Sequence, residues 1–137
     1  GFDEYRERLV APWVLTLREV SAAQRGKSGS PEVFRRQEGE ALVAAIKPDT
    51  RVVALDLTGR SLSTTQLALR FDDIRQASSG LQLMIGGADG LDPACLARVD
   101  ERWCLSSLTF PHFLVRVIIA EQIYRAWTIL HHHPYHR

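Results

Sequence analysis

The sequence has little cysteine, with two residues, Cys95 and Cys104, in a chain of 137. Two thiols are too few for a disulfide framework, and they lack the paired spacing of a zinc site. We therefore expect both to be reduced, buried and chemically inert. Long apolar runs are also missing, because Arg116 interrupts the best one, "FLVRVIIA", well short of the roughly 20 residues that span a bilayer. With no secretory signal visible, the simplest expectation is a cytoplasmic protein without a membrane partner.

Excess charge of one sign is absent as well. The formal net charge is +1, which excludes a polybasic protein that coats nucleic acid. Fifteen of the 17 basic residues are arginine, the side chain suited to bidentate phosphate contacts, although codon bias or surface ion pairs explain this composition more simply. A chain of 137 residues with 45% hydrophobic content is the size of one domain with a real core.

What the chain does have is an alternation of strand-type and helix-type patterns. Predicted strands cover residues 13–20, 51–57, 81–85 and 103–105, and predicted helices cover residues 1–10, 31–46, 64–77, 93–101 and 113–130. Ser30 and Ser63 precede two of the helices as N-caps, and a turn is expected over residues 58–60. Such alternation predicts an α/β fold, with a mostly parallel sheet and helices on both faces.

One turn stands out, "LMIGGADGL" over residues 83–91, where three glycines follow an apolar run. Glycine lets the backbone adopt positive φ and lets a ligand approach the main chain closely. The turn lacks the Lys and Ser or Thr of a P-loop and the G-x-G-x-x-G spacing of a dinucleotide site, and its aspartates disfavour a phosphate. The pattern predicts a nucleoside-like or amino-acid-like ligand held by backbone groups, although an isolated turn of this kind more often only joins a strand to a helix.

Two further loops are expected beside this turn. In a parallel sheet the carboxyl ends of the strands meet at one edge, and ligands bind beyond that edge. "DLTG" follows the predicted strand over residues 51–57, and "SSLTFPH" follows the one over residues 103–105. These loops and "IGGADG" all contain residues that suit a close-fitting pocket.

The blocks "VVALDLTG", "LMIGGADGL", "LSSLTFPHFLVRVIIAEQIYRAW" and "HPYHR", in this order and at these intervals, strongly resemble the bacterial RlmH family. Its members are SPOUT-class methyltransferases that methylate N3 of a pseudouridine in large-subunit (23S) ribosomal RNA with S-adenosylmethionine. The resemblance covers essentially the whole chain. It implies a single SPOUT methyltransferase domain over residues 1–137, with residues 131–137 as a functional C-terminal tail.

The resemblance also implies a deep α/β trefoil knot, which ordinary topology rules would not suggest. It implies a homodimer that acts on ribosomal RNA in the assembled ribosome, with the C-terminal helix and tail near the partner subunit. The helix predicted over residues 113–130 is compatible with this, because apolar residues occupy more than one of its faces. Members of the family begin with an additional strand and loop ahead of "GFDEY", so we expect the opening strand to be absent from this chain.

By the same resemblance, the S-adenosylmethionine pocket takes Leu55, Gly87, Ser106, Ser107, Leu108, Thr109, Phe110 and Pro111. Adenine needs an apolar slot with backbone hydrogen-bond partners, and the methionine end needs a few polar groups. Main-chain groups and Leu108 suit the adenine. Asp56 is expected to form a turn or to support the pocket, and His112 to start a helix or line the pocket wall.

The resemblance makes Tyr135, His136 and Arg125 the candidate catalytic residues. An imide nitrogen such as N3 of pseudouridine is protonated and poorly nucleophilic at neutral pH, so its proton must be removed or shared. Histidine side chains titrate near neutral pH, which suits His136 to that task. Arg125 could stabilise the developing anion or grip a phosphate, and an ion pair with Glu121 one helical turn earlier explains its position equally well.

Three adjacent histidines, residues 131–133, suggest a metal site at first sight. Consecutive residues point in different directions, however, and a helical metal site needs spacings of three or four, so no metal is expected. Two alternative functions remain open: a SPOUT methyltransferase that acts on another RNA, and a cofactor-binding or RNA-binding module without catalysis.

Overall fold

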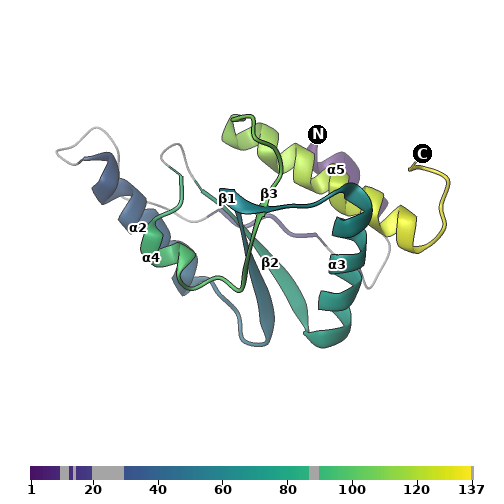
Figure 1. The fold of residues 1–137 in the computed structure, drawn as a ribbon, viewed down its shortest axis with the longest axis horizontal. Coiled ribbons are helices and arrows are strands. Elements are labelled where there is room, and N and C mark those ends of the chain that lie inside the picture. The colour runs from purple at the N-terminus through teal and green to yellow at the C-terminus, as the bar shows by residue number, and fades with distance from the viewer. Residues whose placement is uncertain (10–12, 14, 20–29, 87–89, 137) are drawn as a thin grey trace.

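The computed structural model describes residues 1–9, 13, 15–19, 30–86 and 90–136. Helices and strands alternate along most of this part of the chain (Figure 1). Their order is α1 (Phe2–Arg8), α2 (Pro31–Ala44), β1 (Thr50–Ser61), α3 (Thr64–Ala77), β2 (Gly80–Ile85), α4 (Pro93–Leu96), β3 (Glu101–Cys104) and α5 (His112–Leu130). The predicted α/β class is confirmed.

The described sheet has the strand order β2-β1-β3, and both pairings are parallel. Thr50 lies opposite Gly80, and the pairing of β1 with β2 runs to Leu55 opposite Ile85. On the other side of β1, Leu55 lies opposite Trp103. The central strand therefore reaches the carboxyl edge of the sheet at Leu55.

Helices cover both faces of the sheet, as predicted, because side chains alternate along β1. Val53 is fully buried in one core, which α3 and α5 build with Trp103 of β3. Val52 and Ala54 face a second core with Met84 and Cys95, where α2 and α4 supply the cover. Both faces of β1 are thus apolar, which explains its nearly continuous hydrophobic sequence.

Local capping signals set the starts of two helices. The Ser30 hydroxyl accepts a hydrogen bond from the backbone N–H of Val33 at 3.3 Å and opens α2. Ser63 opens α3 with a full capping box, in which its hydroxyl accepts from the backbone N–H of Gln66 and the Gln66 side chain accepts from the backbone N–H of Ser63. Both predicted N-caps are confirmed.

The strand predicted over residues 13–20 is wrong for the part that the structure describes. Trp13 and residues 15–19 form no strand. Trp13 instead packs edge-on against Phe71 of α3, with ring centroids 6.1 Å apart, and Leu15 packs against the same core. Alternating hydrophobicity reports alternating burial, and an extended segment can satisfy it by packing without pairing to a neighbouring strand.

The turn predicted over residues 58–60 is also wrong, because β1 continues to Ser61. The register shifts instead, and both Leu55 and Arg60 lie opposite Trp103, with the residues between them forming an irregularity in the strand. Within it, the Asp56 carboxylate accepts from the backbone N–H of Thr58 at 3.0 Å, a local contact that Asp commonly makes with the residue two positions on. Gly59 permits a close approach to β3, where a Cβ would lie 2.6 Å from the carbonyl carbon of Arg102.

The helix predicted over residues 93–101 is shorter than expected, because α4 ends at Leu96. Asp100 explains the early end. Its backbone N–H donates to the Val52 carbonyl, and its carboxylate accepts from the Val52 N–H, each at 2.8 Å. These two bonds hold the chain at the sheet, so β3 begins at Glu101, two residues before the predicted start.

The structure also bears on the expected state of the two cysteines and on the expected lack of a membrane-spanning helix. Both cysteines are free, but only Cys95 is buried. Cys104, the last residue of β3, is partly exposed, contrary to the prediction that both are buried. Among the described residues, no helix has the length and apolar composition needed to cross a bilayer. The trefoil knot stays a prediction.

Candidate functional site

The segment between β3 and α5 carries most of the predicted cofactor residues, and it lies at the carboxyl edge of the sheet (Figure 1). Leu55 is the last residue of β1 that pairs with β2, and it is partly buried. Pro111 is the N-cap of α5. The structure therefore brings the end of β1 and the start of α5 to the same edge of the sheet, as the sequence predicts.

The glycine turn enters this edge after β2. Gly86 is required by packing, because a Cβ there would lie 2.7 Å from the carbonyl carbon of Gly90 and 2.9 Å from the nitrogen of Leu91. Gly90 adopts a φ of +78°, which favours glycine. Gly87, the predicted ligand-contacting residue, lies outside the described residues. Two of the three glycines thus have a structural reason that is independent of any ligand.

The residues from 106 to 111 offer a mainly exposed surface. Ser106 is partly buried, and its hydroxyl accepts from the backbone N–H of Leu108 at 3.0 Å, while its carbonyl accepts from the Cys104 thiol at 3.1 Å. Phe110 is also partly buried. Ser107, Leu108, Thr109 and Pro111 are exposed. Ser106 therefore shapes the loop, whereas its neighbours remain accessible to a ligand.

Large apolar side chains are exposed on the segments that form this edge. The exposed fractions are 60% for Leu57 in β1, 66% for Leu108 and 69% for Phe113 in the first turn of α5. Exposed apolar side chains of this size suit a flat heterocycle or another protein surface. The apolar side chains at this edge thus fit the apolar slot that adenine requires.

A second group of predicted residues meets at the other end of α5. Arg125 donates to Glu121 Oε1 from Nε at 2.7 Å, and its Nη2 lies 2.7 Å from the same oxygen. Its remaining terminal nitrogen, Nη1, lies 3.2 Å from Nδ1 of His136. The ion pair with Glu121 raises the pKa of Arg125 further above its ordinary value, chiefly through the hydrogen bond. Arg125 therefore links helix and tail as a permanent cation.

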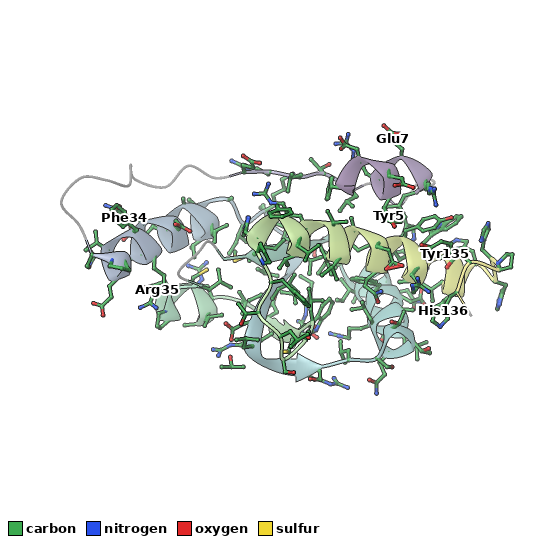
Figure 2. The ribbon with its side chains drawn as sticks, turned by 90° about the horizontal axis from the view of Figure 1, so that it is seen from above. Tyr5, Glu7, Phe34, Arg35, Tyr135 and His136 are labelled. Atoms are coloured by element: carbon green, nitrogen blue, oxygen red, sulfur yellow. The ribbon has the colours of Figure 1, made fainter. Side chains whose placement is uncertain are left out.

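Tyr135 completes this group. Its ring lies 4.9 Å from the Arg125 guanidinium carbon and packs edge-on against Tyr124 at 4.8 Å, and its hydroxyl donates to Glu121 at 3.4 Å. Tyr5 of α1 packs near Tyr124, and Figure 2 shows Tyr5 at the same end of the molecule as Tyr135 and His136. Desolvation, together with the Glu121 charge, raises the pKa of Tyr135. Its hydroxyl is thus kept protonated at neutral pH.

The histidine run serves to end the helix. His131 stacks on Trp127 at 4.8 Å, and its Nδ1 lies 2.9 Å from the Trp127 carbonyl. His133 donates its backbone N–H to the Thr128 carbonyl at 2.7 Å. In the part of the chain that the structure describes, no group of three or more His, Cys, Asp or Glu side chains is placed to hold a metal ion.

The two groups of candidate residues are far apart within one chain. Arg125 follows Pro111 by 14 positions on the same helix, which at 1.5 Å per residue corresponds to about 20 Å along its axis. In Figure 2, Tyr135 and His136 lie at the opposite end of the elongated molecule from α2. A methyl group cannot pass between groups at that separation, so the candidate site is in two halves.

Comparison with known proteins identifies the family. A family model described as "Predicted SPOUT methyltransferase" matches residues 1–136. The chain belongs to the SPOUT methyltransferase family.

Relatives of this SPOUT chain share nearly half of its residues. It is 46% identical to a protein from Marinomonas sp. (strain MWYL1), 50% to one from Thioalkalivibrio sulfidiphilus and 48% to one from Nitrosococcus oceani. Each is named ribosomal RNA large subunit methyltransferase H, and each alignment covers the whole of this chain. The aligned share of the relative is 88%, 88% and 87%, respectively.

Two surface hollows of the SPOUT domain lie away from its candidate site. One of about 280 Å³ opens near the amino ends of the strands, beside Thr50 and Asp100, and another of about 490 Å³ runs along β1 and α3 beside Arg60. Neither includes Leu55 or any residue from 106 to 111. Both contain Arg70, which is already bound by Glu101. We therefore assign these hollows no part in cofactor binding.

Sequence reasoning undervalued one residue of the SPOUT site. The sequence predicts Glu121 only as an ion-pair partner that would explain the position of Arg125. In the structure it accepts hydrogen bonds from both Arg125 and Tyr135, so two catalytic candidates depend on it. The spacing of four between Glu121 and Arg125 was the available signal, but the return of the tail to the same carboxylate was not visible in the sequence.

Proposed function

We propose that the chain is an S-adenosylmethionine-dependent methyltransferase that methylates N3 of a pseudouridine in 23S ribosomal RNA. It acts on the assembled ribosome in the cytoplasm, as a homodimer. Membership of the SPOUT family and relatives named as large-subunit ribosomal RNA methyltransferases support the reaction class. The convergence of Arg125, Tyr135 and His136 supports a built acceptor site.

The carboxyl edge of the sheet is the cofactor half of this site. S-adenosylmethionine supplies a methyl group on a positively charged sulfur, already activated for transfer. The protein therefore mainly aligns donor and acceptor. Leu55 and Leu108 provide apolar contacts for adenine, and the exposed residues Ser107 and Thr109 offer polar groups beside them. The backbones of Gly86 and Gly90 lie close together beside this edge, where a Cβ on Gly86 would lie 2.7 Å from the carbonyl carbon of Gly90.

The tail and the second half of α5 form the acceptor half. The N3 nitrogen of pseudouridine lies between two carbonyl groups, and loss of its proton leaves negative charge on their oxygens. Tyr135 and His136 present polar atoms for these oxygens, and the fixed positive charge of Arg125 stands directly behind them. Preorganised donors and charge of this kind stabilise an anion without further rearrangement.

The main support for a dimer is the separation of the cofactor half and the acceptor half along α5. About 20 Å of helix lies between the start of α5 and Arg125, and this separation supports a site completed by a second copy. Leu57, Leu108 and Phe113 expose the apolar surface at the cofactor edge that such a contact would cover. Each complete site would then combine the cofactor half of one chain with the tail of the other.

The proposal is tested by measuring binding and transfer separately. Calorimetry measures the binding of S-adenosylmethionine, and tritiated S-adenosylmethionine measures methyl transfer to 70S ribosomes, isolated large subunits and free 23S RNA. We expect binding together with transfer to ribosomes, and mapping of the labelled nucleotide to N3 of a pseudouridine. Transfer to another RNA would redirect the assignment to a different SPOUT substrate, and binding without any transfer would identify a non-catalytic module.

A further inference from the structure

Arg125 is held in one orientation by two partners, Glu121 and Tyr135. Two of its nitrogens, Nε and Nη2, are bound to the same Glu121 oxygen, and the aromatic ring of Tyr135 lies against the guanidinium. Only 28% of the Arg125 side chain and 18% of the Glu121 side chain are exposed. The third nitrogen, Nη1, is consequently aimed at His136 rather than free to follow a ligand.

The partner atom on His136 then has a defined protonation state. Arginine has only N–H donors and no acceptor, so a hydrogen bond between Nη1 and Nδ1 requires a bare Nδ1 lone pair. A neutral imidazole with a bare Nδ1 carries its single proton on Nε2. His136 therefore presents an N–H group on the far side of its ring, and its only basic nitrogen is already occupied.

We propose that Arg125, held by Glu121, fixes His136 as the Nε2–H tautomer, so that His136 meets the methyl acceptor as a hydrogen-bond donor and does not take its proton. The role of donor rests on the proposed function, whereas the tautomer does not. Glu121 and Arg125 are positioning residues in this arrangement. His136 is the residue that touches the acceptor.

The acceptor chemistry suits a donor at this place. An imide carries a carbonyl on each side of its N–H, and each carbonyl oxygen accepts a hydrogen bond. The N3 proton leaves to solvent water, and Nε2–H of His136 stabilises the negative charge that remains on the neighbouring oxygen. The single hydroxyl proton of Tyr135 is already donated to Glu121, which leaves this task to Nε2–H of His136. Among the described residues, the charged and titratable groups at this end of the molecule are Glu121 and Arg125 of α5, Tyr135 of the tail, and Tyr5 and Arg8 of α1. The last two pack on Tyr124.

Nitrogen NMR of the imidazole rings tests the tautomer without any substrate. Long-range nitrogen–proton correlation spectra of the ¹⁵N-labelled full chain above pH 7 distinguish Nδ1–H from Nε2–H, and the His136→Gln variant identifies the signal. We expect His136 to be Nε2–H in the wild type and in Arg75→Ala, which removes a matched ion-paired arginine from α3. In Arg125→Ala we expect a mixture of both tautomers. A wild-type signal from Nδ1–H, or an unchanged tautomer in Arg125→Ala, would overturn the proposal.

Substitution of His136 tests the donor role on ribosomes. Glutamine keeps an N–H near the position of Nε2 but cannot accept a proton near neutral pH, whereas alanine removes both properties. A donor predicts that His136→Gln keeps more than about a tenth of the wild-type kcat and that His136→Ala falls well below it. A general base predicts that both variants lose about a hundredfold or more. Equal loss in the two variants, with circular dichroism showing both folded, would therefore contradict the donor role.

The two experiments distinguish failure of the proposed function from failure of the tautomer proposal. If the wild type transfers no methyl group to any RNA, the proposed function is wrong, and the NMR result still decides whether Arg125 fixes the tautomer. If the wild type is active and His136 carries its proton on Nδ1, the function stands and the inference is wrong. Glu121→Ala tests whether Glu121 positions Arg125. This variant should give the same mixture of tautomers as Arg125→Ala, although Arg125 and His136 are both still present.

Discussion

Replacement of Glu101 by glutamine should destabilise the fold in a way that depends on pH. Glu101 is the first residue of β3, and its carboxylate accepts from Arg70 Nε at 2.9 Å, Arg51 Nε at 3.0 Å and Trp103 Nε1 at 3.1 Å. Only 17% of the side chain is exposed. One carboxylate thus joins α3, β1 and β3, and its removal leaves two arginines without their shared anion.

The magnitude follows from the carboxyl pKa. Hydrogen bonds, first from Arg70 and then from Arg51 and Trp103, lower the pKa of Glu101 from 4.5 to about 2, although burial opposes the change. A tenfold change in proton affinity corresponds to about 1.4 kcal/mol, so the ionised group stabilises the folded chain by at most about 3 kcal/mol at neutral pH. Solvent screening of the partly exposed arginines reduces this value, and we expect about 2 kcal/mol.

The direction with pH is set by the lowered pKa. A carboxyl whose pKa is lower in the folded chain contributes its full stabilisation above the unfolded value, here about pH 4.5, and loses it as the pH falls toward about 2. The difference in unfolding free energy between the wild type and Glu101→Gln should therefore be constant from pH 7 to about pH 5. By pH 3 it should fall to about half or less.

Urea denaturation at pH 7, 5.5 and 3 measures this difference, because urea, unlike guanidinium, leaves the ionic strength unchanged. Glu40→Gln is the matched control, since Glu40 is exposed on α2 and should change stability by less than about 0.5 kcal/mol at every pH. Equal stability of Glu101→Gln and the wild type at pH 7 would refute the argument, as would a difference that does not shrink by pH 3.

Two further predictions concern the core and the glycine turn. Phe71 is 5% exposed and packs edge-on against Trp13 and Trp103, so Phe71→Ala should lower the unfolding free energy by about 3–5 kcal/mol. Leu69 is 59% exposed on the same helix, and Leu69→Ala should lower it by less than about 1 kcal/mol in the same urea experiment. Gly86→Val should weaken S-adenosylmethionine binding at least about tenfold in calorimetry, because its Cβ would collide with the backbone of Gly90 and force the turn open. An unchanged affinity in a folded Gly86→Val protein would remove this turn from the cofactor pocket.

The parts of the fold that the sequence predicted well depend on local signals. Ser30 and Ser63 lie next to the helices that they cap, so each start is encoded within three residues. The early end of α4 depends instead on Asp100 bonding to Val52, 48 positions away, which no local pattern encodes. The prediction of a strand from Trp13 onward was wrong for a related reason, because strand formation requires a paired neighbour as well as alternating side chains.

In the candidate site, too, contacts between residues near in sequence could be predicted, whereas contacts that depend on a chain reversal could not. The Glu121–Arg125 pair follows from a spacing of four on a helix and was foreseeable. The contact of His136 with Arg125 depends on the chain reversing after α5, where His132 adopts a φ of +55° that residues with a Cβ rarely take. A single non-glycine residue in the left-handed region leaves little trace in sequence, so the linkage between helix and tail required the structure.

The central claim, that each complete site is shared between two chains, is tested most directly by mixing two inactive variants. Gly86→Val damages the cofactor half and His136→Ala the acceptor half, so each homodimer alone should be nearly inactive. After the two are unfolded together and refolded, random pairing makes about half of the dimers mixed, and each mixed dimer has one intact site out of two. Methyl transfer to ribosomes should therefore return to about a quarter of the wild-type rate. If native mass spectrometry shows mixed dimers and the transfer rate stays at the background of the two parents, the shared site is contradicted.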